Sequence, residues 1–110
     1  MKILTVPRSK DAMNRLDYDK NIEGDLIELY LETSAFNELW KTKIFKEINS
    51  SLNIIIDICE DEKIEFNKLK TAKAVVIRHV ENSEATLGLI MLLGMINLAE
   101  KYETGLFFYF

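Results

Sequence analysis

The stretch TLGLIMLLGMINLAEKYETGLFFYF, residues 86–110, is apolar enough to belong in a membrane, in a protein core or against a partner. Its first part, Leu87–Ala99, has 13 residues. As a helix it would be about 20 Å long, whereas the hydrocarbon core of a bilayer is roughly 30 Å thick. Acidic residues flank it, Glu84 before and Glu100 after, so it lacks the basic flanks of a surface anchor. The stretch therefore predicts a central, buried helix of a small domain, and no membrane partner.

Composition favours one folded domain over residues 1–110. The chain is 48% hydrophobic and 29% charged, as in ordinary globular proteins, and no linker or internal repeat divides it. Its one cysteine, Cys59, lies in an apolar run, where we expect it to be buried, and a lone cysteine excludes an intrachain disulfide. The first residues, MKILTVPRSKD, do not have the pattern of a secretory signal. We therefore expect a cytoplasmic protein.

Periodicity predicts both strands and helices. Strands are expected at Lys2–Val6, Asp25–Glu32, Leu52–Cys59 and Leu106–Phe110, with a polar turn at 60–63 before the alternation resumes at Ile64 and Phe66. Asp25–Glu32 also fits a helix face. Helices are expected at Ser9–Leu16, from Ser34 to Asn49, from Asn67 to Asn82, and in the apolar stretch, with Ser83 as its cap and Gly105 as its end.

Because these elements interleave without a regular βαβ repeat, the predicted class is α+β. We expect a mixed or antiparallel sheet of about four to five strands, packed with three helices, one of them central and buried.

Sequence patterns for catalysis, metals and cofactors are missing. His79 and Cys59 are the only residues of their types, too few for a zinc site, and we interpret His79 as a structural or surface residue. The four glycines are scattered rather than clustered in a phosphate-binding loop. Asp61-Glu62-Lys63 faintly resembles one half of a metal-dependent nuclease motif, but the other half is absent at a sensible distance. We therefore expect no enzyme, no cofactor and no metal.

Charge is unevenly distributed along the chain. Residues 22–65 carry four basic and eleven acidic side chains, a net of −7, whereas the whole chain has a net of −4. If these carboxylates gather on one side, their field repels nucleic acid and attracts basic proteins, although surface carboxylates also serve solubility alone. The predicted partner-binding residues are Glu28, Glu32, Asp57, Glu60, Asp61, Glu62 and Glu65. Tyr30 or Trp40 would anchor the contact.

The end of the chain, NLAEKYETGLFFYF, combines a buried apolar helix, an acidic turn and a brief aromatic strand. In this respect the chain resembles the small immunity proteins of bacterial polymorphic toxin systems, including contact-dependent growth inhibition, most clearly over Ile64–Phe110. The resemblance implies a cytoplasmic inhibitor that binds one cognate toxin, often a basic nuclease, and covers its active site or substrate groove.

Two other classes stay open at this point. A general protein-interaction or regulatory module, such as a homo-oligomer, would use the aromatic end Phe107–Phe110 as a sheet edge or contact patch. A small enzyme would have to use carboxylates alone, in a pocket where their pKa values are perturbed. We rank the toxin inhibitor first and the enzyme last.

Overall fold

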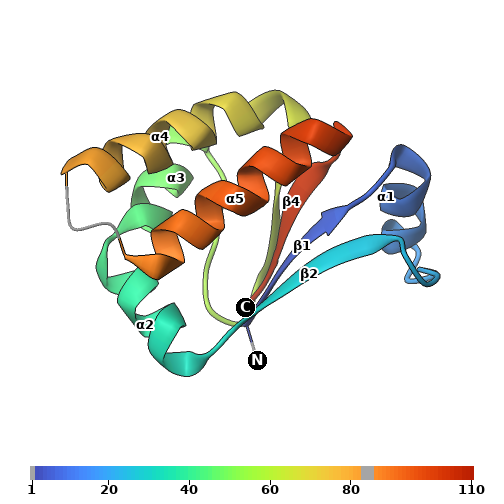
Figure 1. Ribbon diagram of the computed structural model, residues 1–110, viewed down its shortest axis with the longest axis horizontal. Coiled ribbons are helices and arrows are strands. Elements are labelled where there is room, and N and C mark those ends of the chain that lie inside the picture. Colours follow the sequence, from blue (N-terminus) through green and yellow to red (C-terminus); the bar gives the residue numbers. More distant parts are fainter. Residues whose placement is uncertain (1, 83–85) are drawn as a thin grey trace.

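The computed structural model in Figure 1 describes residues 2–82 and 86–110. Across these residues, five α-helices and one antiparallel sheet of four strands form an α+β fold, in the order β2-β1-β4-β3. The elements are β1 (Lys2–Pro7), α1 (Lys10–Asp17), β2 (Leu26–Leu31), α2 (Thr33–Lys41), α3 (Ile44–Leu52), β3 (Asp61–Glu65), the 3-10 helix η1 (Phe66–Lys68), α4 (Leu69–Asn82), α5 (Leu87–Tyr102) and β4 (Gly105–Tyr109). The expected class is confirmed, and the sheet is antiparallel.

The first and last strands lie side by side in the middle of the sheet, so both chain ends come together (Figure 1). The ammonium group of Lys2 donates a hydrogen bond of 2.6 Å to the Phe110 carbonyl oxygen. Because β4 is an inner strand, its aromatic end is not a free sheet edge: Phe107, Phe108 and Phe110 are at most 8% exposed. This corrects the expectation that residues 107–110 form a sheet edge.

The core lies between one face of the sheet and helices α2–α5, with α1 on the other side of the strands (Figure 1). Alternate strand residues point into this core, because side chains of a strand point to opposite faces in turn. The strand residues buried on this face are Leu4, Val6, Leu31, Ile64, Leu106 and Phe108. Within the described part of the chain, no helix is long and apolar enough to cross a membrane.

The single helix expected from Ser34 to Asn49 is two helices, which is one reason why the helix count exceeds three. Lys43 adopts a left-handed backbone conformation, φ 64°, between α2 and α3. The Thr42 hydroxyl donates to the Leu39 carbonyl and accepts from the Ile44 amide, which bridges the break. The break lets both helices turn their apolar faces into one core. Ser34 lies inside α2, and Glu32 occupies the cap position.

The expected strand Leu52–Cys59 is wrong. Leu52 ends α3, and Asn53 is left-handed at φ 56°. The side-chain amide of Asn49 donates to the Ile56 carbonyl (3.0 Å) and accepts from the Ile56 amide (2.7 Å), so it takes the place of a partner strand. The segment is a loop in which Ile55 is 68% exposed. Cys59, expected to be buried, is also exposed.

The expected polar turn at 60–63 belongs instead largely to strand β3, which begins at Asp61. It pairs with β4 because Ile64, opposite Leu106, fills the core, while the charged residues beside it face out from an edge strand. At the next boundary, the 3-10 turn of residues 66–68 precedes α4, so Asn67 is not its cap.

Helix α5 is capped by Thr86, whose hydroxyl accepts from the Leu89 amide at 3.2 Å; Ser83 and Glu84 lie outside the described residues. The helix ends at Tyr102, before Gly105, which belongs to β4. A Cβ at Gly105 would lie 2.8 Å from the Ile64 carbonyl oxygen, so close strand packing requires the glycine.

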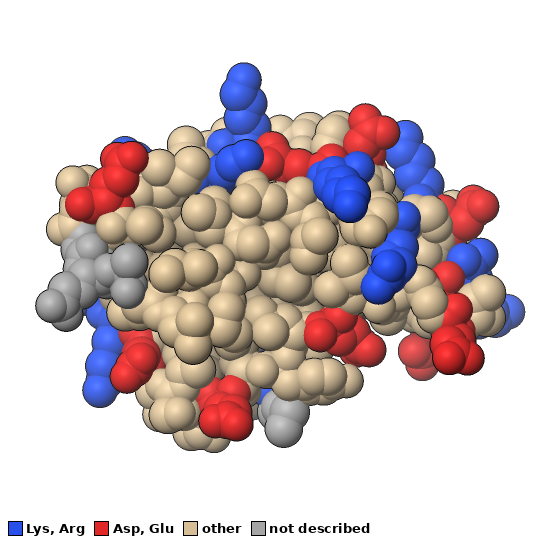
Figure 2. All heavy atoms as spheres, viewed as in Figure 1, with Lys and Arg blue, Asp and Glu red and all other residues tan. Residues whose placement is uncertain are grey.

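The burial predicted for α5 holds on one side only. Its inner face is formed by the buried residues Gly88, Leu89, Leu92, Met95, Ile96 and Ala99. Its outer face is exposed, with Leu87 at 68% and Ile90 at 52%. Figure 2 shows that this side of the molecule is a broad uncharged surface with charged side chains around its rim.

Candidate functional site

The sheet face opposite the core is partly covered by α1 and carries several of the predicted partner-binding residues. Because strand register fixes which side chains are neighbours, two rows cross all four strands on this face. The rows are Glu28–Thr5–Phe107–Lys63 and Tyr30–Ile3–Tyr109–Asp61. The register therefore places polar and aromatic side chains from strands far apart in sequence on a common surface.

A groove of about 630 Å³ lies where the end of α1 and the residues after it approach β3 and β4. We call it the acidic groove, and its lining residues are Leu16, Asp17, Asp19, Asp61, Glu62, Lys63, Phe107 and Tyr109. Apolar and aromatic side chains supply part of its wall, and most of its charged side chains are carboxylates. This combination suits a ligand that has both an apolar stem and a positive charge.

The pKa of Tyr109 reflects the negative charges around the acidic groove. Its pKa is raised above the ordinary value, first because the phenol is partly buried and then because carboxylates surround it. The contributing carboxylates are Asp61, Asp17, Glu28 and Asp19. A negative field disfavours the phenolate, so the raised pKa is the response expected of a phenol in an acidic surface.

An ion pair ties α1 to the start of β2 and so positions the acidic groove. The Arg15 guanidinium donates to both carboxylate oxygens of Asp25, at 2.8 Å and 2.6 Å, and the Ile22 amide donates to the same carboxylate at 3.0 Å. Asp25 is 6% exposed, and these hydrogen bonds hold its pKa well below the usual range. This ion pair fixes the end of α1 beside β2. Asp17 is the last residue of α1, and Asp19 lies just after it.

Two of the seven predicted partner-binding residues, Glu28 and Asp61, act on Tyr109. Glu62 also lines the acidic groove, but its carboxylate accepts hydrogen bonds from the amides of Ile55 (2.9 Å) and Lys63 (2.8 Å). The Glu62 carboxylate therefore stabilises the loop before β3 through these two hydrogen bonds.

The other four predicted residues lie elsewhere. Glu65 is further along β3, 3.9 Å from the Lys63 ammonium, and Glu32 precedes α2. Asp57 and Glu60 lie in the loop before β3, where the Asp57 carboxylate accepts from the Ile58 amide. Since β2 and β3 are opposite edges of the sheet, the seven residues do not form one continuous patch.

Sequence reasoning missed Asp17 and Asp19, which lie outside the acidic middle segment. Their region, residues 1–21, has a net charge of +2 and gave no reason to expect acidic function. The available signal was local: the polar stretch DYDKN follows the short helix, and a helix packed beside a strand brings its last turn to the sheet.

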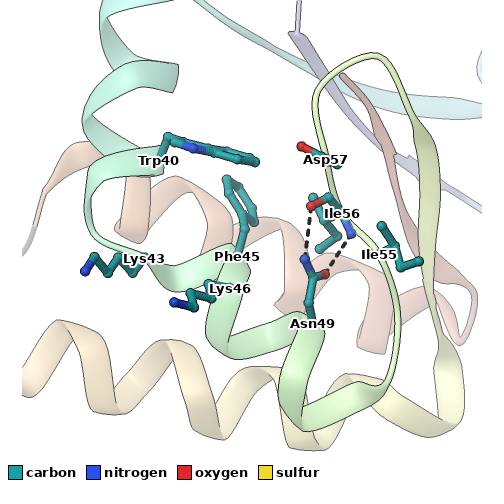
Figure 3. Close-up of a pocket in the computed structure, with 8 residues that line it drawn as sticks. All are labelled: Trp40, Lys43, Phe45, Lys46, Asn49, Ile55, Ile56 and Asp57. Carbon is teal, nitrogen blue, oxygen red and sulfur yellow. Dashed lines mark hydrogen bonds between the residues drawn. The ribbon is translucent and has the colours of Figure 1, made fainter.

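A second pocket, of about 360 Å³, lies between α2, α3 and the loop 53–60 (Figure 3). Trp40 and Phe45 form its aromatic wall, with ring centroids 5.6 Å apart, and the loop residues Ile55 and Ile56 lie opposite. Figure 3 also shows Asn49 reaching across to the backbone of Ile56. Trp40 is therefore on the helical layer, away from the acidic groove.

Comparison with protein-family models, curated proteins and solved structures finds no match to this chain. Among the described residues, no group of three or more histidine, cysteine, aspartate or glutamate side chains is placed to hold a metal ion.

Proposed function

We propose that this protein is an inhibitor that binds a cognate protein toxin, in the manner of the bacterial immunity proteins that it resembles, and that it acts in the cytoplasm. The observation that carries the proposal is the gathering of Asp17, Asp19, Glu28 and Asp61 around Tyr109. Carboxylates held at the rim of an aromatic groove complement the arginine and lysine side chains with which a nuclease binds phosphates.

The mechanism is electrostatic guidance followed by occlusion. Exposed carboxylates attract a basic surface over a distance of about 10 Å at moderate salt, which speeds encounter and orients the partner. Once docked, a basic side chain of the toxin lies in the acidic groove, and the toxin surface that would bind nucleic acid is covered. The inhibitor needs no catalytic group of its own for this.

Aromatic side chains supply the short-range part of the contact. Tyr30 is 53% exposed on the same sheet face as Tyr109, two strands away. Tyrosines are enriched among residues that dominate binding energy, because they bury a large area and keep a polar tip. Trp40, the other aromatic anchor considered from the sequence, lies on the helical layer and is left out of the proposed contact.

The proposal is tested with a groove variant in which Asp17→Lys, Glu28→Lys and Asp61→Lys are combined. The matched control is Glu81→Lys, an exposed acid at the end of α4 in the helical layer. Each protein is used to capture partners from the native cell, and the captured protein is then expressed with and without it. We expect wild type and control to capture a basic protein and to suppress its toxicity.

The groove variant should lose both capture and protection, while its circular dichroism spectrum stays that of wild type. If the groove variant protects as well as wild type, the acidic groove is not the binding surface. If the captured protein is not toxic when expressed alone, the inhibitor function is wrong even if binding depends on the groove.

A further inference from the structure

The fold leaves the outer face of α5 without a partner. This face is made of seven residues along one side of the helix, of which Leu87 and Ile90 are exposed whereas Met91 and Leu98 also pack partly against the core: Leu87, Ile90, Met91, Gly94, Asn97, Leu98 and Lys101. It has no charge before Lys101 near its end, and Figure 2 shows the charged side chains at the rim of this side. An exposed apolar surface with a polar rim is typical of a protein interface.

The shape of the face suits a second helix. Steps of three and four residues place these side chains in one stripe along the helix, as in the seam between two packed helices. Gly94 is at the centre of the stripe, and a Cβ built there would meet no atom within 4 Å. A glycine at this point lets a second helix approach closely. Glycine weakens a helix, and packing within the single chain does not require one here.

A second copy of α5 suits the face because the stripe is symmetric about Gly94. In an antiparallel pair related by a two-fold axis at Gly94, Ile90 of one copy lies opposite Leu98 of the other. Leu87 then lies opposite the aliphatic stem of Lys101. The dipoles of the two helices also oppose each other, which is favourable.

The charges at the two ends of α5 are complementary under the same two-fold axis. Near its start lies Glu38 of α2, the neighbour of Leu39, whose side chain lies against Gly88. Near its end, where the Lys73 ammonium lies 3.0 Å from the Glu100 carboxylate, the other exposed charges are the cations Lys101 and Lys70 and the acid Glu103, so this end is positive on balance. An antiparallel pair brings the acidic end of one copy to the basic end of the other, which fixes the direction of packing.

We propose that the protein forms a homodimer in which the two α5 helices pack antiparallel across a two-fold axis near Gly94. The interface lies on the opposite side of the sheet from the acidic groove, so it leaves that groove free. The proposal therefore goes beyond the inhibitor function, and either can fail without the other.

The test is the mass in solution, measured by size-exclusion chromatography with light scattering over a range of protein concentrations. We expect wild type at twice the 12.8 kDa of one chain. Ile90→Glu should raise the dimer dissociation constant at least about tenfold, since the symmetric interface loses the side chain twice. The matched control is Ile55→Glu, which changes a similarly exposed isoleucine in the loop before β3 and should leave the dimer intact.

Gly94→Leu separates the interface from the stability of the chain. Leucine favours a helix over glycine, and the site is open in a single chain, so at concentrations at which wild type and variant are both monomers this variant should unfold at a higher temperature. The same side chain blocks the close approach of two helices and should weaken the dimer. The proposal is overturned if wild type has the mass of a single chain at roughly 1 mM. It is also overturned if neither Ile90→Glu nor Gly94→Leu changes the dimer.

Discussion

Replacing Asn49 by alanine should free the loop 53–60 from α3. The change removes the two hydrogen bonds between the Asn49 side chain and the backbone of Ile56, at 3.0 Å and 2.7 Å. At about 1 kcal/mol each they contribute about 2 kcal/mol, and the better helix propensity of alanine returns about 0.5 kcal/mol. We therefore expect the free energy of unfolding to fall by about 1.5 kcal/mol.

The assay is urea unfolding followed by circular dichroism, with the fluorescence of Trp40, the chain's one tryptophan, as a local probe because it lines the pocket under this loop. The control is Asn37→Ala, which makes the same chemical change at an exposed position within α2. It should be neutral or slightly stabilising. If Asn49→Ala destabilises no more than this control, the Asn49 side chain does not hold the loop, and our explanation for the missing strand fails.

Three further changes test the sheet and the acidic groove. Thr5 is 1% exposed and its hydroxyl lacks a hydrogen-bond partner within the described structure, so Thr5→Val should raise the free energy of unfolding by about 1 kcal/mol in urea titrations; a loss of stability would show that the hydroxyl is satisfied. The pKa of Asp25 is lowered by Arg15, so its contribution to stability is full above about pH 4 and declines below it. Asp25→Asn should therefore be destabilising at pH 7, and its difference from wild type should shrink as unfolding is measured at lower pH; a constant difference would contradict this sign. Finally, Asp61→Asn should lower the pKa of Tyr109 in an ultraviolet titration, and an unchanged titration curve would remove that carboxylate from the phenol's surroundings.

The first and last elements of the chain were predictable because local sequence patterns decide them. The strand Lys2–Val6 and the terminal strand Leu106–Phe110 were found within one residue at each end, since β-favouring residues there are bounded by proline and glycine. The short helix expected at Ser9–Leu16 is α1, Lys10–Asp17, and the Ser9 hydroxyl caps it by accepting from the Ala12 amide.

The middle of the chain could not be predicted because distant contacts decide it. Alternating isoleucines at 54, 56 and 58 resemble a strand, yet the backbone of Ile56 finds its partner in a helix side chain rather than in a sheet. The real edge strand is mostly charged, and it is selected by the buried Ile64 and by the free edge of β4. Neither partner is visible in a local window of sequence.

Only part of the candidate site could be predicted, because distant contacts also decide which side chains meet there. Glu28 and Asp61 belong to the acidic segment that composition points to, but their meeting beside Tyr109 depends on the register of all four strands. Asp17 and Asp19 join them only because the ion pair of Arg15 holds α1 in place. Charge counts along a chain do not contain this information.

The rate of association with the captured basic partner, measured as a function of salt, tests the proposed role of the acidic groove most directly. For wild type and Glu81→Lys we predict a rate constant that falls steeply as ionic strength rises, because the carboxylates steer the basic partner. The variant with lysine at 17, 28 and 61 should associate far more slowly at low salt and show little of this decline. Equal rates and equal salt dependence in all three proteins would contradict the proposed role of the acidic groove.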